Sequence, residues 1–572
     1  MKYLVYFLKE RKGKVVLTLA LLLGQAVGTL LIPFLIASIV DNGILKGDMN
    51  KILEIGGVML LVLLITTIIA TFGSFYSADL AAGLGYEMRD KLFRKSQQLS
   101  VHDFDTIGVS SMITRSTSDI SIIQQTFGLI LQLIVPAPFL IVSSIIMTSK
   151  ASSKLSIVLI ISIIVFIIFA GLIIKKSVLI STRVQKKLDQ INKVIRENIT
   201  GIRVIRAFGN ENYEKDRVSD SFRGYATDMI TLNKLFSVLS PIIWLIIGLS
   251  MSVMIWIGGM LAIEGAMELG QITAVIEYSV ITLSYLILAT STSVTLPKMI
   301  ACFNRIEEVL EINSKIKDLA IIEEITNNNV PTLEFDNVSF YYPGAEEPVI
   351  KDLSFTCNEG ETVAIIGSTG SGKSTIANLI LRLHDIDKGK ISINGVNIKN
   401  LSLNDLRDKV GYVPQKALLF SGTIESNLKM GNEKATSDDI KRALRISQSE
   451  AFVGKLPEGT NSLVAQSGTN FSGGQKQRLS IARALVRKTP IYIFDDSFSA
   501  LDLKTDLALR KSLKENMTNA VKLIIAQRVS TIMDADKILV LEQGDLVGFG
   551  KHNELMKNCS VYQAIIKSQM KI

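Results

Sequence analysis

The segment Glu361-Thr-Val-Ala-Ile-Ile-Gly-Ser-Thr-Gly-Ser-Gly-Lys-Ser-Thr375 joins a short apolar run to a glycine-rich turn that ends in lysine. The apolar run is rich in β-branched residues and ends at Gly367, which predicts a buried strand. The residues after Thr375, Ile-Ala-Asn-Leu-Ile-Leu, have the pattern of a helix. A G-x-x-x-x-G-K-S motif between a strand and a helix predicts a loop that binds the phosphates of a nucleotide.

The chemistry of this loop follows from its residue types. Glycines let successive backbone N–H groups turn inward around phosphate oxygens at a helix N-terminus. We predict that Lys373 reaches the β- and γ-phosphates and that the Ser374 hydroxyl is a ligand of Mg²⁺. The predicted nucleotide-binding residues of the loop are Gly367, Ser368, Thr369, Gly370, Ser371, Gly372, Lys373, Ser374 and Thr375.

Two more segments of the C-terminal half carry chemistry. Pro490-Ile-Tyr-Ile-Phe-Asp495-Asp496 is a predicted strand with Asp495 at its tip, where the carboxylate is predicted to hold Mg²⁺ through water. Ser472-Gly473-Gly474-Gln475 opens a predicted helix, and such a helix start forms a second anion-binding element. Because one domain needs only one phosphate loop, we predict that this second element serves a nucleotide held by a different copy of the domain.

The N-terminal half consists of long apolar runs. Five runs contain no Asp, Glu, Lys or Arg, and the sixth is interrupted only by Glu277; they cover residues 15–40, 55–78, 120–149, 155–174, 235–263 and 269–297. Each is long enough to cross a hydrocarbon layer of roughly 30 Å as a helix. We therefore predict an α-helical six-span transmembrane domain at 1–312 with long intracellular helical extensions. A linker at 313–330 and an α/β phosphate-loop nucleotide-binding domain at 331–572 follow.

The charges predict the orientation of these spans. Lys and Arg gather before the first run and in residues 175–234, whereas the loops 41–54, 150–154 and 264–268 are short and poor in net positive charge. The positive-inside rule then places both termini, the nucleotide-binding domain and the long loops 79–119 and 175–234 in the cytoplasm, beneath a plasma or inner cell membrane. The formal net charge of +9 is better explained by cytoplasmic placement of Lys and Arg than by nucleic-acid binding, and six spans argue against a nucleic-acid partner. Three scattered cysteines without a C-x-x-C pair suit a reducing compartment and argue against zinc.

Glu277 is a candidate substrate contact. A carboxylate in an apolar span marks a functional site by default, because leaving it unpaired at the bilayer centre costs about 2.5–3.5 kcal/mol on insertion scales. The alternative is that Glu277, a turn or two past an outer loop, reaches water.

With these motifs in place, the chain resembles a half-transporter of the ATP-binding cassette (ABC) exporter family, multidrug type, over essentially its whole length. The resemblance implies that the nucleotide is ATP with Mg²⁺ and that the long-loop tips near 110–115 and 208–213 are coupling helices. It implies that Tyr342 stacks on adenine and that Gln415 links Mg²⁺ and the attacking water to the membrane domain. It also implies that Ser472, Gly473, Gly474 and Gln475 close over ATP bound to the opposite subunit, and that the Ser499-Ala-Leu-Asp502 loop crosses the dimer interface.

Two positions depart from the family pattern. Asp496 stands where hydrolytic members have Glu, and Gln527 stands where they have the switch histidine; the three histidines of the chain are His102, His384 and His552. A carboxylate must reach the attacking water to polarise it, and Asp is about 1.5 Å shorter than Glu. A misplacement of about 1 Å can cost about 100-fold in rate. Gln527 can donate a hydrogen bond to the γ-phosphate but cannot become a cation.

These departures predict a site that binds ATP and hydrolyses it poorly, with Asp496, Gln527 and Gln415 as its catalytic residues; slow turnover by Asp496 and a water is the alternative. Ser472, Gly473, Gly474 and Gln475 match the signature motif of the family completely. A weakened ATP site beside a complete signature motif resembles the degenerate-site subunit of a heterodimeric bacterial ABC exporter. A homodimer is the alternative assembly. We predict an ATP-driven exporter of hydrophobic or amphipathic compounds, in which lipophilic small molecules are the cargo and the lipid bilayer is the surroundings. An ATP-gated or sensory membrane protein shares every motif and is the alternative function.

Overall fold

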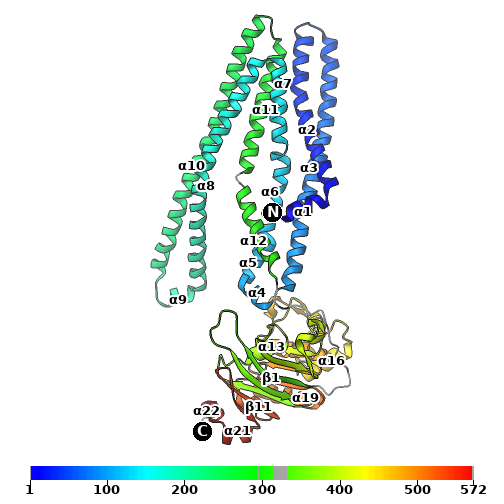
Figure 1. Ribbon diagram of the computed structural model, residues 1–572, viewed down its shortest axis with the longest axis vertical. Helices are drawn as coiled ribbons and strands as arrows, with labels where there is room; N and C mark the ends of the chain where they lie inside the picture. Colours follow the sequence, from blue (N-terminus) through cyan, green and yellow to red (C-terminus); the bar gives the residue numbers. More distant parts are fainter. Residues whose placement is uncertain (1, 294, 314–315, 317–331, 570–572) are drawn as a thin grey trace. The chain divides into compact units, whose positions relative to one another are not determined.

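The computed structural model describes residues 2–293, 295–313, 316 and 332–569 (Figure 1). Backbone contacts divide the chain into two compact units, which we describe separately. The first contains Met1–Gln97 and Ile107–Ile312, and the second contains Gln98–Thr106 and Asn313–Ile572. The predicted linker at 313–330 lies outside the described residues except for Asn313 and Ile316.

Among its described residues, the first unit contains helices and the turns that join them, and no strand. Its α-helices are α1 (Lys2–Glu10), α2 (Lys12–Ile39), α3 (Met49–Gln98), α5 (Val109–Thr114), α6 (Ile120–Leu129), α7 (Pro136–Ala151), α8 (Ser153–Thr200), α9 (Ile202–Ala207), α10 (Glu211–Ile263), α11 (Leu269–Ser293) and α12 (Leu296–Glu311). Three short π-helices, η1 (Val40–Ile44), η2 (Arg115–Asp119) and η3 (Ile130–Ile134), are continuous with their α-helical neighbours.

Six helical stretches are long and apolar enough to cross a membrane, as the sequence predicted. They are Lys12–Ile44, Met49–Gln98, Val109–Ala151, Ser153–Thr200, Pro241–Ile263 and Leu269–Glu311. None of the 18 residues in the most apolar window of α3 is buried in the chain, and in the other five spans the buried share is 28–44%. Apolar side chains exposed in this number require a lipid environment or a second chain.

Several spans continue well beyond a bilayer thickness. Figure 1 shows α8 and α10 side by side as a long hairpin that α9 closes. The chain reverses at the end of α3 through the short helix α4 (Val101–Ile107), which Gly108 separates from α5 at a φ of +79°. The predicted first tip, residues 110–115, is therefore wrong, because those residues lie on the helix after the turn. Helical periodicity locates helices but not the residue at which the chain reverses.

At one end of the spans, Asp41 connects the first span to the last. Its Oδ1 accepts a hydrogen bond of 2.6 Å from the backbone N–H of Gly270 in the first turn of α11, and Asp41 is 6% exposed. A Cβ on Gly270 would lie 2.2 Å from the carbonyl oxygen of Ala37, so only glycine permits this approach. Glu277 lies on α11 with its side chain exposed, and no hydrogen bond or ion pair of the described residues involves it.

An ion pair with a buried carboxylate joins the start of the third span to α12. Asp119, 2% exposed, accepts from Arg305 Nε at 2.8 Å and from Arg305 Nη2 at 2.6 Å. Arg115 donates to the carbonyl oxygen of Arg305 and to Glu308 Oε2, both at 2.8 Å. Bidentate charge-assisted bonds of this kind have a defined geometry, so they hold η2 and α12 in one register.

The second unit is built on a six-stranded sheet in the order β12-β11-β3-β10-β9-β6, in which β12 alone is antiparallel to its neighbour. A four-stranded antiparallel sheet, β2-β1-β4-β5, and a two-stranded sheet, β7-β8, accompany it. The strands are β1 (Leu333–Phe340), β2 (Ile350–Cys357), β3 (Thr362–Gly367), β4 (Lys388–Ile393), β5 (Val396–Asn397), β6 (Val410–Val413), β7 (Gly422–Thr423), β8 (Leu463–Val464), β9 (Ile491–Asp495), β10 (Val521–Ile525), β11 (Lys537–Glu542) and β12 (Asp545–Gly550).

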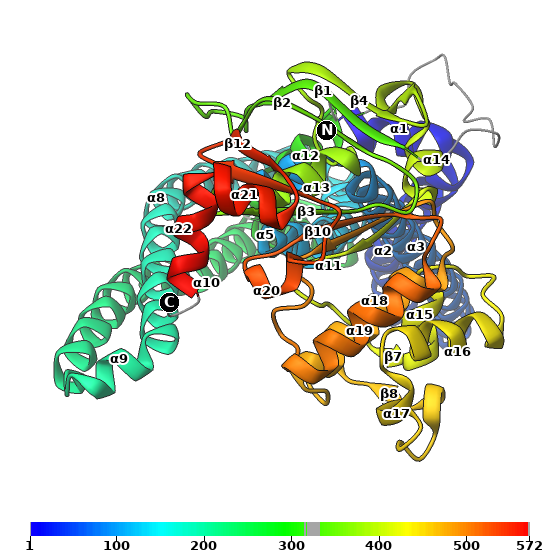
Figure 2. The same ribbon diagram turned by 90° about the horizontal axis from the view of Figure 1, so that it is seen from below.

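The helices of this unit surround the sheets and include the group α15 to α18 seen together in Figure 2. They are α13 (Lys373–Ile380), α14 (Leu403–Asp408), α15 (Ile424–Lys429), α16 (Ser437–Ile446), α17 (Glu450–Val453), α18 (Gly473–Val486), α19 (Leu503–Asn516), α20 (Val529–Ile532), α21 (His552–Asn558) and α22 (Ser560–Gln569). Short 3₁₀ helices are η4 (Ile398–Asn400), η5 (Gly459–Asn461) and η6 (Gln466–Gly468).

The main sheet is buried on both faces. Along β3, Val363 and Ile365 belong to the core shared with the antiparallel sheet, whereas Ala364 and Ile366 belong to the core shared with the helices. Successive side chains of a strand point to opposite faces, which explains this alternation. A strand with two buried faces reads as a continuous apolar run, as the sequence of β3 does. The observed architecture matches the predicted fold class.

We expect Asp119→Asn to destabilise the first unit, because it removes the charge that pairs with Arg305 while keeping the side-chain volume. Breaking a fully buried ion pair costs about 3–5 kcal/mol and losing an exposed pair about 0–1 kcal/mol, and we expect a value between these because Asp119 is buried but the Arg305 side chain is 49% exposed. The measurement is the thermal unfolding midpoint in lipid nanodiscs.

The matched control is Asp79→Asn, whose partner Lys14 lies in an exposed pair. Exposed pairs contribute about 0–1 kcal/mol, so its midpoint is expected to stay close to that of the unmodified protein. Equal shifts for both variants would contradict the structural role assigned to Asp119.

Candidate nucleotide site

The phosphate loop joins β3 to α13 with a backbone that requires glycine. Gly370 and Gly372 have φ values of +85° and +91°. A Cβ on Gly372 would lie 2.6 Å from Ile350 Cδ1 and 2.7 Å from the carbonyl oxygen of Val349. These two constraints explain why the tight turn into the helix needs a residue without a side chain.

Lys373, the first residue of α13, folds back over the loop. Its Nζ donates to the carbonyl oxygens of Gly367 at 2.9 Å and Ser368 at 2.6 Å, and the residue is 9% exposed. Burial lowers the pKa of Lys373, and the carboxylates of Asp496 and Asp495 oppose that shift. The ammonium group is therefore positioned at the centre of the loop beside two carboxylates.

The loop fits the phosphates of a nucleotide on two observations. The buried Ser371 Oγ has no hydrogen-bond partner among the described residues, although a buried hydroxyl normally has one. The ammonium of Lys373 makes two hydrogen bonds and has three protons, so it can donate one more. Phosphate oxygens would accept hydrogen bonds from both groups. The hydroxyl and the ammonium lie at the N-terminus of α13, where the helix dipole favours negative charge.

The predicted Mg²⁺ ligands are only partly brought together. Ser374 Oγ donates to Asp495 Oδ1 at 2.9 Å, and Asp495 is 3% exposed at the end of β9. Gln415 instead donates from Nε2 to Asp496 Oδ2 at 3.3 Å. No group of three His, Cys, Asp or Glu side chains among the described residues could hold a metal by itself. One hydroxyl and one carboxylate suit Mg²⁺, which is usually bound with waters and substrate phosphates.

The electrostatics around Asp495 also favour a cation. Burial raises the pKa of the Asp495 carboxyl, the hydrogen bond from Ser374 opposes this, and the negative charge of Asp496 adds to it. Tyr412 lies on the neighbouring strand β6, and burial raises the pKa of this tyrosine, with the charge of Asp495 adding to the shift. A divalent cation would stabilise the ionised form of Asp495. Sequence reasoning missed Tyr412, because only the pairing of β6 with β9 reveals its position.

The three predicted catalytic residues meet in one hydrogen-bonded network. Asp496 has a φ of +44°, and its N–H donates to the carbonyl oxygen of Ile525 at 2.8 Å. Its Oδ2 accepts from Gln415 Nε2 at 3.3 Å and from Gln527 Nε2 at 3.0 Å. The two carboxamides come from the loops after β6 and β10, on opposite sides of β9 in the sheet.

Tyr342 lies beside the helix that follows the phosphate loop. Its hydroxyl is 3.2 Å from Thr375 Oγ1, and its ring makes edge contacts with Phe340 and His384 at centroid distances of 5.0 and 5.3 Å. The ring is half-buried, so one side of it is available next to the loop. The predicted contact with adenine stays a prediction.

The second anion-binding element is well formed and exposed. Ser472 caps α18 through a capping box in which its Oγ accepts from Gln475 N–H and Gln475 Oε1 accepts from Ser472 N–H. Ser472 and Gly473 are exposed, and a Cβ on Gly473 would meet nothing within 4 Å. No hydrogen bond of the described residues joins this element to the phosphate loop of the same chain. Its free N–H groups and helix dipole suit an anion that arrives from outside.

Asp502 begins α19 as its N-cap. Its side chain accepts from Thr505 N–H at 2.9 Å, and this bond lowers the pKa of the Asp502 carboxyl. The loop before it approaches the second anion-binding element, since a Cβ on Gly474 would lie 3.3 Å from the carbonyl oxygen of Ala500. Asp502 thus has a structural role within the chain, and its predicted place at a dimer interface stays a prediction.

Six membrane-spanning helices followed by a phosphate-loop domain with a second anion-binding element define a membrane transporter driven by a nucleotide. The family model for the ABC transporter transmembrane region matches residues 15–286, and the model for the ABC transporter matches residues 350–499. The chain belongs to the ABC exporter family. Members of this family couple ATP hydrolysis to transport and work as dimers in the membrane.

Relatives match the chain over nearly its full length. An uncharacterized ABC transporter ATP-binding protein of Mycobacterium tuberculosis is 34% identical over 558 residues, which is 97% of this chain and 96% of the relative. The uncharacterized ABC transporter ATP-binding protein YfiB of Bacillus subtilis is 34% identical over 98% of this chain and 97% of its own length. An ATP-dependent lipid A-core flippase of Wigglesworthia glossinidia brevipalpis is 31% identical over 98% of this chain and 96% of its own.

A solved structure of a bacterial Atm1-family ABC exporter with ATP bound has the same fold. Its TM-score is 0.82 at 24% identity, and the match covers 98% of both chains.

We expect Lys373→Met to weaken ATP binding by about 10- to 100-fold, the loss that follows from removing a charged hydrogen bond to phosphate. The measurement is the dissociation constant of a fluorescent ATP analogue with Mg²⁺. The matched control is Lys522→Met, which removes another buried ammonium whose Nζ bonds the carbonyl oxygens of Gly360, Met517 and Ala520. Unchanged binding in Lys373→Met would refute the assignment of the loop.

Proposed function

We propose that this chain is one half of a heterodimeric ATP-driven exporter, with its transmembrane domain at 1–312 and its ATP-binding domain at 331–572. Its own site, with ATP and Mg²⁺ on Lys373, Ser374 and Asp495, hydrolyses ATP slowly. Its element Ser472–Gln475 completes the hydrolytic site of the partner chain. The slow site stays occupied and holds the two ATP-binding domains together while the other site turns over.

The observation that carries this proposal is the position of the Asp496 carboxylate. Its Oδ2 already accepts two carboxamide hydrogen bonds, from Gln415 and Gln527. A general base has to accept a proton from the attacking water, and this oxygen has no free lone pair for it. Proton abstraction would then depend on Oδ1 of Asp496. Because Asp is shorter than Glu, this oxygen lies farther from the attacking water, which slows hydrolysis further.

Gln527, on the loop after β10, supports the same conclusion. A carboxamide can donate to the γ-phosphate, but it cannot carry the positive charge that an imidazolium brings to the transition state. The histidines of the chain occupy other places: His552 bonds Tyr562, His384 packs beside Tyr342, and His102 lies on α4. The site thus keeps its groups for binding and lacks those for fast hydrolysis.

The element Ser472–Gln475 supports a two-chain site. It is capped, exposed and unobstructed, and no hydrogen bond of the described residues joins it to the phosphate loop of its own chain. Such an element suits the γ-phosphate of a nucleotide bound to another chain. A partner with the usual Glu and His would then supply the rapid site, whereas two copies of this chain would have two slow sites.

We propose hydrophobic or amphipathic compounds as cargo. The spans carry few charges, and the apolar side chains of α3 are exposed in the chain. One relative at 31% identity is named as a lipid A-core flippase, which supports a lipid-like class of substrate. Glu277, exposed on α11 without a partner among the described residues, suits a cationic group on the cargo.

We also propose that both termini and the ATP-binding domain are cytoplasmic. Lys and Arg are dense before the first span and between 175 and 234, which lies on the extended parts of α8 and α10 around α9. Positive loops remain on the cytoplasmic side, where ATP is available.

We expect Gly473→Glu to lower the ATPase rate of the purified complex at least tenfold, because it places a carboxylate where the partner's γ-phosphate binds. The substitution does not disturb α18, since the space is open and an acidic residue suits the first turn. The control Ser437→Glu adds the same charge to the exposed first turn of α16 and is expected to leave the rate unchanged.

In the same assay, Asp496→Asn is expected to change the rate by less than about twofold, because this site contributes little turnover. Robust activity of the chain purified alone that disappears in Asp496→Asn would refute the slow site. Equal trapping of ADP with vanadate on both chains would refute it as well.

Transport separates the exporter from an ATP-gated or sensory protein. Inside-out vesicles that contain both chains are expected to accumulate a fluorescent lipophilic compound only with ATP and Mg²⁺. The Gly473→Glu complex should lose this accumulation together with its ATPase activity. ATPase activity without accumulation across a panel of lipophilic compounds and fluorescent lipids would favour the sensory alternative.

A further inference from the structure

Gln569, at the end of α22, makes two hydrogen bonds to the backbone of the loop that carries Gln527. Its Nε2 donates to the carbonyl oxygen of Gln527 at 2.6 Å, and its Oε1 accepts from the N–H of Val529 at 2.8 Å. Val529 begins α20, which has no side-chain cap of its own. Gln569 therefore satisfies a helix N-terminal N–H that lacks a partner within its helix, and in doing so it holds the backbone of Gln527.

The rest of α22 anchors this carboxamide. Tyr562 and Ile566 are 0% and 3% exposed and precede Gln569 by seven and three residues, so all three lie on one face of the helix. Tyr562 and Ile566 pack in the core that also contains Val529, whereas Gln569 itself is exposed. The Tyr562 hydroxyl lies 2.8 Å from His552 Nδ1, which ties α22 to α21.

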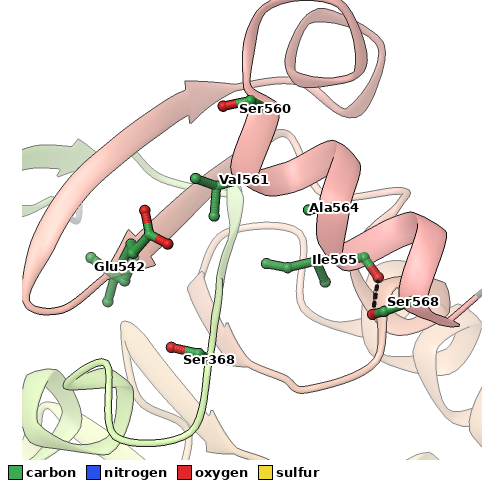
Figure 3. A pocket seen from close by; sticks show the side chains of 8 residues that line it. Ser368, Glu542, Ser560, Val561, Ala564, Ile565 and Ser568 are labelled. Carbon is green, nitrogen blue, oxygen red and sulfur yellow. Dashed lines mark hydrogen bonds between the residues drawn. The ribbon is translucent and has the colours of Figure 1, made fainter.

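The neighbouring face of α22 does not pack on the phosphate loop. A cavity of about 480 Å³ lies there, and Figure 3 shows Ser368 of the loop across it from the helix. The helix contributes Ser560, Val561, Ala564, Ile565 and Ser568 to its lining. This space separates α22 from the phosphate loop. The hydrogen bonds that link the helix to the nucleotide site are those of Gln569 to the loop that carries Gln527.

We propose that Gln569 is a positioning residue for recognition of the γ-phosphate at this chain's ATP site. By holding the backbone of Gln527, it keeps the Gln527 carboxamide directed at Asp496 and at the terminal phosphate of bound ATP. This inference rests on the place of Gln527 in the proposed site, and it requires no hydrolysis there. Its consequence is that α22 sets how well the site distinguishes ATP from ADP.

The test measures nucleotide selectivity in the full-length complex. Photolabelling with 8-azido-ATP and Mg²⁺, followed by separation of the two chains on a denaturing gel, reports the site of this chain alone. In Gln569→Ala, competition by AMP-PNP is expected to weaken about two- to tenfold, the effect of one neutral hydrogen bond, while competition by ADP stays the same. General destabilisation of the domain would weaken both competitors equally.

Gln569→Glu separates the two hydrogen bonds, because a carboxylate still accepts from Val529 N–H but cannot donate to the Gln527 carbonyl. It is expected to lose selectivity at least as far as Gln569→Ala does, because its second carboxylate oxygen repels the Gln527 carbonyl oxygen. The control Gln563→Ala removes a carboxamide of the same helix, which bonds the carbonyl oxygen of Met556, and it should change neither competitor.

An unchanged ratio of AMP-PNP to ADP competition in Gln569→Ala would overturn the inference, whether both nucleotides keep their affinity or both lose it equally. AMP-PNP is not hydrolysed, so the result is independent of the turnover rate. Rapid hydrolysis at this site together with a shifted ratio would overturn the slow-site proposal and leave the role of Gln569 in place.

Discussion

Parallel pairing of β3, β10 and β9 is the constraint on which the nucleotide site depends. Ile525 at the end of β10 is in register with Ile365 of β3 and with Asp495 of β9. The carboxyl ends of parallel strands meet at one edge of a sheet, so groups more than a hundred residues apart come within hydrogen-bond distance there. The bonds of Ser374 to Asp495 and of Gln527 to Asp496 both follow from this register.

At that edge, binding and catalysis rely on different groups. The phosphate loop binds through backbone geometry and one buried ammonium, and both are intact. Catalysis depends on the free lone pairs of one carboxylate, and the Asp496 oxygen that faces Gln415 and Gln527 is already hydrogen-bonded. This difference between the groups for binding and those for catalysis is the basis for the proposal that the chain holds ATP and hydrolyses it slowly beside a partner with a faster site.

The structure of the first unit is determined by the hydrocarbon of the bilayer and not by water. Backbone groups in hydrocarbon must be satisfied within the helix, so long apolar runs become helices whatever their neighbours are. Some of the polar contacts between these helices join segments far apart in the chain. Asp41 bonds the start of α11, and Asp119 bonds Arg305 on α12. Each of these buried carboxylates holds two spans in a set position.

Local patterns were sufficient for the six spans, the phosphate loop, the strand before it and the signature helix, because period, charge and glycine spacing are properties of neighbouring residues. The departures of Asp496 and Gln527 from the family pattern could also be recognised from the sequence. The tertiary structure was needed for the turn at α4, for Tyr412 beside Asp495, for the two carboxamides on one oxygen and for Gln569 on the backbone of Gln527. Hydrogen bonds between distant segments leave no local pattern, because the register of a sheet and the packing of a helix decide which side chains meet.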